Sequence, residues 1–272
     1  MRIIRLPRYG LAMTRTYVIT GAGSGIGAAT AEVLMERGHR VIGVDLKNAQ
    51  IESDLSTPNG RANAAEKAIE AAGGTVDAVI AAAGIARPVP LTVAVNFFGV
   101  TEFLEAMLPA LAKSGSPRAA VVSSMATLQP VADDLVDMML AGDEPKALEL
   151  GEALAGQGEQ VGYLNYSSSK RALSRWIRRE CITPRWAGAH IPLNAVAPGT
   201  VLTPMTEGLL ATKEGAAMVD ASVPMPLNYH QSAESVALLL AWLSNEENTH
   251  TTGQTIYVDG GADASLRGDD IW

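Results

Sequence analysis

The sequence predicts an α/β fold in which one parallel sheet lies between two layers of helices. Short, continuously apolar runs alternate with segments whose apolar residues repeat at helical spacing, as expected for strands that are covered on both faces. A glycine-rich turn joins the first of these strands to the first helix. The chain has 272 residues, of which 47% are hydrophobic, enough to bury a full core. We therefore expect a single domain over residues 13–272.

Composition and charge narrow the class of protein. A net charge of -8 leaves no basic surface for a phosphate backbone, so nucleic acid is not an expected partner. Cys181 is the only cysteine and the four histidines follow no ligand spacing, so neither a disulfide nor a metal site is predicted. No apolar run reaches the ~18 residues that span a bilayer, and residues 1–12 lack the apolar core of a signal peptide. We expect a soluble, cytoplasmic protein without membrane contact, in which residues 1–12 form a disordered extension.

The first strand and the first helix enclose a glycine loop with a specific spacing. Residues 17–20 form the strand, and helical spacing of apolar residues begins at Ile26. Between them Thr20 opens the pattern T-G-x-x-x-G-x-G, which differs from the commoner G-x-G-x-x-G. Glycines let the backbone approach a pyrophosphate, whose charge is met by free N–H groups at the helix N-terminus. We therefore predict a dinucleotide site in a Rossmann-type, doubly wound domain rather than a plain tight turn, with contacts from Gly21, Ser24, Gly25, Ile26 and Gly27.

The second strand carries the residue that is expected to select the cofactor. It spans residues 40–44 and ends in Asp45, eighteen residues beyond Gly27. A carboxylate at this place can accept both ribose hydroxyls of an adenosine and repels a 2′-phosphate, so NAD is preferred to NADP. Lys47 is the nearby cation that would favour NADP, and we interpret it as solvated surface.

Two more turns at strand ends are expected to contact the cofactor. Asp54–Leu55 follows a weak strand at residues 50–53 and can bracket the adenine ring, although the aspartate serves equally well as a helix cap. A helix over residues 62–72 then leads to a continuously apolar strand at residues 76–82. This strand ends in Ala83–Gly84, whose small side chains leave room for the cofactor beside the sheet.

The long helix predicted over residues 92–111 carries Asn96 close to its start. The apolar residues of this segment fall on one stripe, which indicates a helix that packs against the core. A buried asparagine there can hold a water molecule for proton relay, and a simple polar contact with neighbouring backbone fits equally well.

Ser124 closes the next buried strand, at residues 119–122, and precedes an unusual segment. A hydroxyl at the carboxyl end of a central parallel strand faces the crevice in which such sheets bind ligands. Ser124 can therefore donate to a substrate oxygen, and helix capping is the alternative. From about residue 129 to 160 the chain is acidic, with helical patterns interrupted by Gly142 and Pro145. We expect a helical insertion of two short helices beside the site, with apolar faces covered by the cleft or by another subunit.

Tyr166 and Lys170 form the pair on which the chemistry depends. They stand four residues apart on a predicted helix, so their side chains share one face. Free tyrosine has a pKa near ~10. An ammonium about 5 Å away, at an effective dielectric of ~20, favours the phenolate by roughly 3 kcal/mol, or about two pK units. That shift suits a general acid or base, so we predict proton transfer by Tyr166, although the spacing alone is more often an ordinary exposed helix face.

The remaining elements complete the sheet and cover the cleft. A strand at residues 192–197 ends in Pro198–Gly199, and Thr203 just beyond it can reach the amide of a nicotinamide. Residues 200–230 are rich in methionine and other apolar residues, which suits a substrate lid, and core packing fits each of these side chains equally well. A last helix, a last strand and a polar tail follow at residues 232–243, 255–258 and 263–272.

These residues together resemble the short-chain dehydrogenase/reductase family over nearly all of residues 14–262. The resemblance implies a seven-stranded parallel sheet between two helical layers, a nicotinamide dinucleotide and an Asn-Ser-Tyr-Lys active site. It makes Tyr166 the acid or base and Ser124 the donor that holds the substrate oxygen. Lys170 would bind the nicotinamide ribose and lower the phenol pKa, while Asn96 would anchor a water that leads to Lys170. The match rests on the loop from Thr20 to Gly27, Asp45, Ala83–Gly84, Asn96, Ser124, Tyr166, Lys170, Pro198–Gly199, Thr203 and Val258–Gly261.

Three departures from the family pattern bear on substrate and assembly. The usual Asn-Asn-Ala-Gly is here Ala81–Gly84, so a side-chain hydrogen bond that steadies the central sheet is missing. Eleven residues separate Gly84 from Asn96, fewer than usual, and 42 positions separate Ser124 from Tyr166, more than usual. Together with the stretches Asp54–Thr57, Asn96–Gly99 and Leu108–Leu111, these departures make the chain most similar to bacterial 3α-hydroxysteroid dehydrogenase/carbonyl reductases. That similarity implies a bulky apolar or steroid-like substrate.

We therefore predict an NAD-dependent oxidoreductase that interconverts a secondary alcohol and a ketone, assembled as a homo-oligomer, either dimer or tetramer. Two alternatives stay open. The chain can be a non-catalytic dinucleotide-binding sensor or scaffold, for which the glycine loop suffices, or a dehydrogenase of a small non-steroid alcohol. A sensor has no need of Ser124, Tyr166 and Lys170, so turnover on a panel of alcohols and ketones excludes it. Comparison of steroids with small cyclic ketones separates the two enzymes.

Overall fold

The computed structural model describes residues 14–227 and 230–271, so the extension predicted over residues 1–12 lies outside the described part. Within these ranges, seven parallel strands form the main sheet in the order β3-β2-β1-β4-β5-β6-β9. The predicted fold class is confirmed. The order reverses between β1 and β4, which is where sheets of this class bind ligands. The strands are β1 (Thr16–Thr20), β2 (Arg40–Asp45), β3 (Ile51–Glu52), β4 (Ala78–Ala81), β5 (Arg118–Val122), β6 (Leu193–Pro198) and β9 (Thr255–Val258).

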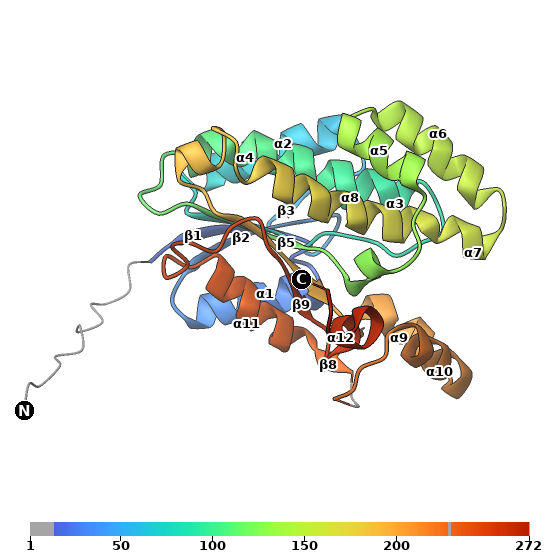
Figure 1. Cartoon of the computed structure of the whole chain (residues 1–272). Coiled ribbons are helices and arrows are strands. Elements are labelled where there is room, and N and C mark those ends of the chain that lie inside the picture. The colour runs from blue at the N-terminus through green and yellow to red at the C-terminus, as the bar shows by residue number, and fades with distance from the viewer. Residues whose placement is uncertain (1–13, 228–229, 272) are drawn as a thin grey trace, which may run out of the picture.

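Helices cover both faces of this sheet, as Figure 1 shows. One layer consists of α1 (Gly25–Glu36) and α11 (Ala233–Leu243), and the other of α2 (Pro58–Ala71), α4 (Gly99–Leu111) and α8 (Leu164–Glu180) with the helices packed on them. Successive residues of a strand point to opposite faces, so Tyr17 and Ile19 join the core under α1 and α11, whereas Val18 joins the other core. Two separate apolar cores therefore hold the sheet in place.

The helix predicted over residues 92–111 is interrupted close to its start. It consists of α3 (Leu91–Val93), the π-helical turn η1 (Ala94–Phe98) and α4. By length and composition Leu91–Leu111 is apolar enough to cross a membrane, but 67% of that window is buried inside the protein, as in a core helix. A π-turn inserts an extra residue and occurs frequently at functional sites. Here it contains Asn96.

The helical insertion after Ser124 contains three helices instead of the two predicted. They are α5 (Asp133–Ala141), α6 (Glu144–Ala155) and the single turn α7 (Glu159–Gly162). Gly142, with a φ of 75°, ends α5 in the left-handed conformation, and Asp143 caps α6 through the Lys146 N–H. Buried Leu135, Val136 and Met139 of α5 face the core beside α8. The cover of the insertion's apolar face is thus α8 of the same chain.

Short elements follow β6 on the side of the cleft. β7 (Val201–Leu202) pairs with β8 (Gln231–Ser232), while α9 (Pro204–Leu210) and α10 (Lys213–Ser222) stand out from the molecule in Figure 1. No side chain in these two helices, both within the described ranges, is buried. The helix α12 (Ala262–Arg267) lies where the sequence indicated only a polar tail, and buried Ala262 begins it. The 3-10 turns η2 (Met125–Leu128) and η3 (Ala187–Ala189) complete the elements named here.

Candidate active site

One cleft of about 520 Å³ collects the residues that the sequence marked, at the carboxyl ends of β1, β2, β4, β5 and β6. Asn96 is the exception among them, because it is fully buried and does not line the cleft. The predicted residues that do line it are Gly21, Ser24, Gly25, Ile26, Gly27, Asp45, Asp54, Leu55, Ala83, Gly84, Ser124, Tyr166, Lys170, Pro198, Gly199 and Thr203. Residues from seven separate segments of sequence thus form one site.

The glycine loop between β1 and α1 has the geometry that a bound pyrophosphate needs. Gly21 has a φ of 73°, and a Cβ there would lie 2.7 Å from the Ala83 nitrogen. A Cβ on Gly27 would lie 2.1 Å from the Gly21 oxygen, so both positions exclude a side chain. Ser24 stands at the N-cap of α1 in extended conformation, and within the described structure its side chain makes no capping bond. N–H groups at the start of α1 therefore stay available to an anion, which fits a dinucleotide.

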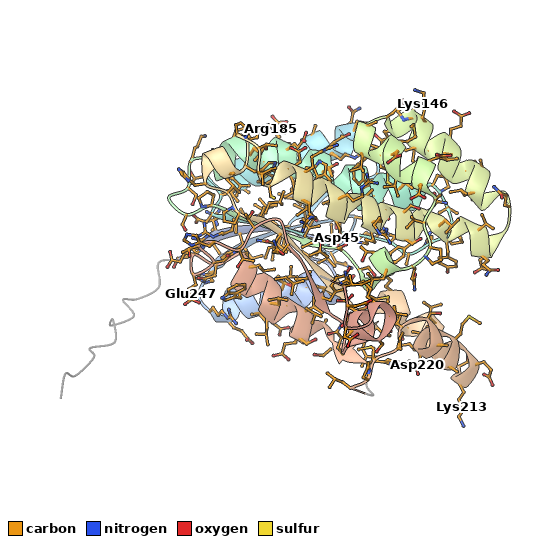
Figure 2. The ribbon with its side chains drawn as sticks, in the orientation of Figure 1. Asp45, Lys146, Arg185, Lys213, Asp220 and Glu247 are labelled. Atoms are coloured by element: carbon orange, nitrogen blue, oxygen red, sulfur yellow. The ribbon has the colours of Figure 1, made fainter. Side chains whose placement is uncertain are left out.

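Asp45 is fixed at the end of β2 beside this loop. Its Oδ2 accepts a hydrogen bond from the Gly23 N–H at 2.9 Å, and its Oδ1 accepts from the Leu46 N–H at 2.6 Å. Figure 2 shows Asp45 between the two helical layers, whereas Lys146 lies on the outside of the insertion. Lys47 is exposed and does not line the cleft, which agrees with its interpretation as surface.

Thr20 supplies the support of the sheet that the sequence appeared to lack after β4. Its Oγ1 accepts a hydrogen bond from the Ala83 N–H at 3.2 Å, and its carbonyl accepts from the Ala82 N–H at 3.1 Å. Thr20 itself is 1% exposed. A threonine of the neighbouring strand β1 therefore holds the turn after β4. The threonine that opens the glycine motif carries this second role without any further sequence signal.

The side chain of Asn96 holds the turn after β4 in place through hydrogen bonds with its backbone. Its Oδ1 accepts from the Ile85 N–H at 2.8 Å, and its Nδ2 donates to the Ile85 carbonyl at 2.9 Å and to Ser169 Oγ at 3.3 Å. The polar contact with backbone, one of the two roles considered above, is present. A Cβ on Gly84 would lie 3.1 Å from Asn96 Oδ1 and 3.6 Å from Lys170 Nζ, so a glycine permits this close packing.

Ser124, Tyr166 and Lys170 meet at the inner end of the cleft. Ser124 is 9% exposed, and its Oγ accepts from the Ala126 N–H at 3.1 Å, so the hydroxyl caps η2 and also lines the cleft. Lys170 Nζ donates to the Val122 carbonyl at 2.8 Å and lies 5.9 Å from the centroid of the Tyr166 ring. The neighbouring Ser123 also lines the cleft, but it is 2% exposed and its Oγ is bonded with Ser174 Oγ at 3.0 Å.

Burial governs the protonation of this group. It raises the pKa of Tyr166 above its usual value, and the hydroxyl of Ser124 opposes that rise. Burial also lowers the pKa of Lys170 to about 8. The predicted lowering of the phenol pKa is therefore wrong for the protein as it stands, since burial disfavours the phenolate more than the Ser124 hydrogen bond favours it.

Apolar side chains that the motifs did not indicate form the outer walls of the cleft. Ile85 and Leu91 line it from the segment that joins β4 to η1, Val95 lines it from η1 itself, and Met205 lines it from α9. Leu91 and Met205 are 43% and 46% exposed, so apolar surface is open to a ligand. The short connection between Gly84 and Asn96 was the sequence feature that could have indicated that Ile85, Leu91 and Val95 line the cleft.

The segment predicted as a lid contributes only its first part to this cleft. Thr203 caps α9 in a capping box with Thr206, and its Cγ2 lies 3.4 Å from the place of a Cβ on Gly25. Met225 and Leu227 instead line a separate cavity of about 1000 Å³ together with Tyr257. The lid stays a prediction, and Met225 and Leu227 do not line the cleft that it would cover.

Comparison with known families agrees with this geometry. Residues 15–136 match the family model described as short chain dehydrogenase, and residues 147–263 match the model described as enoyl-(acyl carrier protein) reductase. The chain belongs to the short-chain dehydrogenase/reductase family, whose members use a nicotinamide dinucleotide to oxidise CH–OH groups or reduce the corresponding carbonyls. The predicted family and enzyme class are confirmed.

Individual relatives resemble the chain over nearly its whole length. The 3-alpha-hydroxysteroid dehydrogenase/carbonyl reductase of Comamonas testosteroni is 34% identical over 92% of this chain and 97% of its own. Coniferyl-alcohol dehydrogenase of a Pseudomonas species is 30% identical over 90% of this chain and 94% of its own. Among solved structures, the 3-alpha-hydroxysteroid dehydrogenase of Pseudomonas sp. B-0831, complexed with NADH, is 38% identical with a TM-score of 0.85. It aligns with 94% of this chain and 100% of its own.

Proposed function

We propose that the protein is an NAD(H)-dependent oxidoreductase that interconverts a secondary alcohol and a ketone of a bulky, apolar, steroid-like kind. The observation that carries the proposal is the convergence of Ser124, Tyr166 and Lys170 in one cleft. Leu91, Val95 and Met205 give that cleft apolar walls suited to such a substrate. The steroid dehydrogenases among the relatives support the same substrate class.

The choice of NAD(H) rests on Asp45. Its carboxylate is oriented by the N–H groups of Gly23 and Leu46, beside the loop that suits the pyrophosphate. A fixed negative charge there favours free ribose hydroxyls and repels a 2′-phosphate. The glycine loop carries no cation to offset it, since Ala22 and Ser24 occupy the positions between the glycines. A relative of known structure that binds NADH agrees with this choice.

Each residue at the inner end of the cleft has a role in this reaction. The nicotinamide, when bound, supplies or accepts the hydride. The Tyr166 hydroxyl donates a proton to the carbonyl oxygen in reduction and accepts it from the alcohol in oxidation, while Ser124 donates a hydrogen bond to that oxygen. The Lys170 ammonium, 5.9 Å from the centroid of the Tyr166 ring, favours the phenolate and so opposes the effect of burial.

The other polar residues act on the cofactor. Lys170 would also bind the nicotinamide ribose, and Thr203 would bind the nicotinamide amide. Asn96 keeps the turn at Gly84 and Ile85 beside the Lys170 ammonium. The water relay from Asn96 to Lys170 stays a prediction.

Replacement of the proton donor tests this function. Tyr166→Phe should lower kcat by about 10²- to 10⁴-fold, the usual contribution of a general acid or base, and leave the NADH dissociation constant within about twofold. Tyr163→Phe is the matched control, because this exposed tyrosine lies one turn earlier in the chain and does not line the cleft. Substantial residual turnover in Tyr166→Phe would refute the acid/base assignment. Tight NADH binding without turnover of any alcohol or ketone in wild type would favour the sensor.

We place the enzyme in the cytoplasm as a homo-oligomer. Arg178 and Arg179 end α8 at the surface, but much of that helix is covered by α5 and α6. An assembly that pairs two α8 helices would therefore have to displace the insertion. This supports an arrangement other than the tetramer usual for the family.

A further inference from the structure

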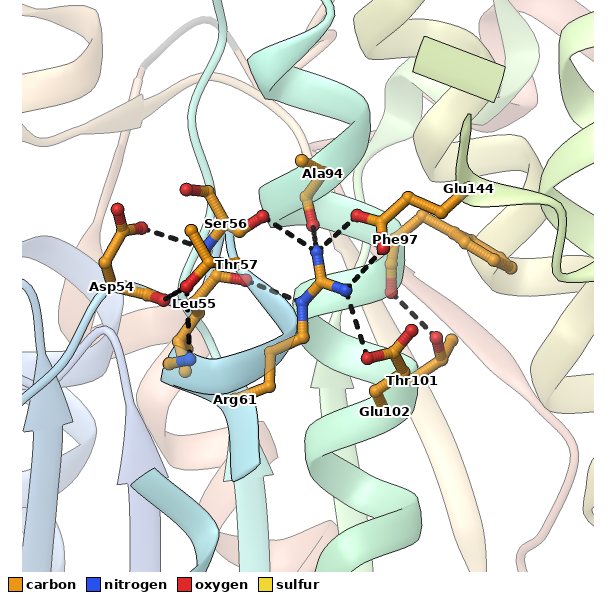
Figure 3. Close-up of polar contacts among 11 residues, drawn as sticks. Asp54, Leu55, Ser56, Thr57, Arg61, Ala94, Phe97, Thr101, Glu102 and Glu144 are labelled. Atoms are coloured by element: carbon orange, nitrogen blue, oxygen red, sulfur yellow. Dashed lines mark hydrogen bonds and ion pairs between the residues drawn. The ribbon is translucent and has the colours of Figure 1, made fainter. Parts of the chain in front are cut away.

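Arg61 of α2 is a buried cation outside the catalytic group. Its side chain is 1% exposed, and each of its three nitrogens has a partner, as Figure 3 shows. Nη1 and Nη2 donate to the two carboxylate oxygens of Glu144 at 2.8 and 2.5 Å, and Nη1 also donates to Glu102 at 3.0 Å. The remaining bonds go to backbone: Nε to the Leu55 carbonyl at 2.9 Å, and Nη2 to the carbonyls of Ser56 at 2.9 Å and Ala94 at 3.3 Å.

The two carboxylates are not equivalent partners. Glu144 receives both arms of the guanidinium and its side chain is 16% exposed, whereas Glu102 makes one contact and is 43% exposed. A paired, poorly hydrated contact is stronger and more directional than an exposed single one. Burial lowers the pKa of Arg61, but hydrogen bonds with Glu144 and then Glu102 outweigh it and raise the pKa above its ordinary value. Glu144 is therefore the main partner.

The carbonyls that Arg61 holds belong to a wall of the cleft. Asp54, Leu55 and Ser56 all line it at the end of β3. A Cβ on Gly60 would lie 1.8 Å from the Asp54 carbonyl oxygen, and one on Gly99 would lie 3.0 Å from the Leu55 carbonyl oxygen. The wall is thus packed closely against the starts of α2 and α4, and Arg61 is the group that binds its carbonyls from inside the protein.

Glu144 brings the insertion into this contact. It is the first residue of α6, 83 positions after Arg61. The two family matches stop at residue 136 and resume at residue 147, so Glu144 lies between them. The link from Glu144 to the cleft wall is therefore a feature of the insertion in this chain rather than of the matched family regions.

We propose that Arg61 and Glu144 form a positioning pair through which α6 holds the Leu55–Ser56 wall and so sets the affinity for NAD(H). This deepens the proposed function and rests on it for the identity of the ligand, with the wall on the adenine side of the cleft. Neither residue lines the cleft, so both act through the backbone that they hold. Loss of the pair leaves the carbonyls of Leu55 and Ser56 without their charged donor or with a reoriented one, and the wall shifts. The catalytic end at Tyr166 keeps its own contacts.

The test compares Glu144→Gln with Glu102→Gln, the same chemical change on the two carboxylates around one guanidinium. NADH binding is measured by fluorescence titration, and ADP-ribose, which lacks the nicotinamide, serves as a competitive probe of the adenine side. Glu144→Gln should raise the dissociation constants of NADH and ADP-ribose by the same factor, about tenfold. This is the size expected when one charge-assisted hydrogen bond is weakened. Its kcat at saturating NADH should stay within about twofold of wild type. Glu102→Gln should change neither dissociation constant by more than about twofold.

Two results would overturn the proposal. One is an unchanged NADH dissociation constant in folded Glu144→Gln, and the other is an equal loss in both variants. Because these constants need no turnover, absence of catalysis in wild type contradicts the proposed function and leaves the comparison intact.

Should Glu144→Gln fail to fold, the double variant Arg61→Met/Glu144→Met replaces the buried pair by apolar side chains of similar length. A stable double variant with weakened ADP-ribose binding supports the positioning role. Two outcomes would show that the pair serves folding alone and would overturn the proposal. One is a stable double variant that binds ADP-ribose like wild type. The other is a double variant that also fails to fold while Arg61→Lys folds and binds normally.

Discussion

Thr20→Val tests whether a threonine of β1 replaces the asparagine that the β4 turn lacks. The change keeps the shape of the side chain and removes the acceptor of the Ala83 N–H, which lies at 3.2 Å. Thr20 is 1% exposed and the Ala83 N–H is partly buried, so water replaces the lost acceptor poorly. A hydrogen bond contributes about 1 kcal/mol and an unsatisfied buried donor costs about 1–3 kcal/mol, so we expect a loss of about 1.5 kcal/mol in the free energy of unfolding. Urea unfolding measures it, and a fall of about 3–6 °C in Tm accompanies it.

Thr30→Val is the matched control for this experiment. Thr30 is also fully buried, but its hydroxyl donates at 2.7 Å to the Ile26 carbonyl, which already takes part in the helix ladder of α1. Its replacement leaves no backbone group without a partner, so the loss of stability should not exceed the about 1 kcal/mol of the hydrogen bond itself and should be smaller than that of Thr20→Val. Thr20→Ser retains the hydroxyl and should be more stable than Thr20→Val. Equal stability of the two valine variants, or Thr20→Val matching wild type, would show that the hydrogen bond does not support the turn.

Three further changes test other parts of the molecule. Ser124→Ala should lower kcat by about 10²-fold with little change in NADH affinity, because it removes a donor to the substrate oxygen, whereas Ser123→Ala should leave kcat nearly unchanged; equal kcat values for the two variants would contradict the assignment. Lys170 has a pKa of about 8 in the folded protein, against an ordinary value of 10.5. Below pH 8 the side chain is protonated in both the folded and the unfolded state, so the cost of burying the charge is present in full. Above pH 10.5 it is neutral in both states and this cost is absent. Wild type should therefore gain unfolding free energy relative to Lys170→Met as pH rises from 8 to 10.5, by up to about 1.4 kcal/mol per pH unit in urea titrations, and parallel curves would refute the burial effect. Removal of residues 129–160 should change the oligomer mass or expose apolar surface of α8 to a dye. Unchanged mass, dye binding and substrate kinetics would contradict both roles of the insertion.

Much of the fold could be predicted because its signals are local. The strand at residues 17–20, the glycine loop and the helix after it follow from spacing within a short window, and the structure has them as β1 and α1. The helix α12 could not be predicted in the same way, since only Ala262 of it is buried and its other residues are polar or exposed. The π-turn around Asn96 shifts the helix by one residue, which a 3.6-residue pattern absorbs without a visible break.

In the candidate site, too, the features with a local sequence signal could be predicted and those that depend on packing could not. Residue type and order in the chain were enough to select the residues that meet in the cleft, because strand ends of a parallel sheet share one edge. The partner of Arg61 stands 83 positions away in a segment without a motif, so only packing reveals it. The direction of the Tyr166 pKa also depends on packing, since the sequence shows that Lys170 is near but not how far the phenol is removed from water.

The partnership of α1 and α11 has a consequence for how the chain is made. These helices pack against each other and close the core that contains Ile19 and Leu34, yet α11 begins almost two hundred residues after α1 ends. At the usual rates of translation, that separation corresponds to roughly 10–40 s on the ribosome. During this interval the apolar surface of the first helix and strand stays uncovered, and chaperones bind such surfaces. A messenger that terminates before Ala233 would yield a product that never hides this surface, and cellular proteases would remove it.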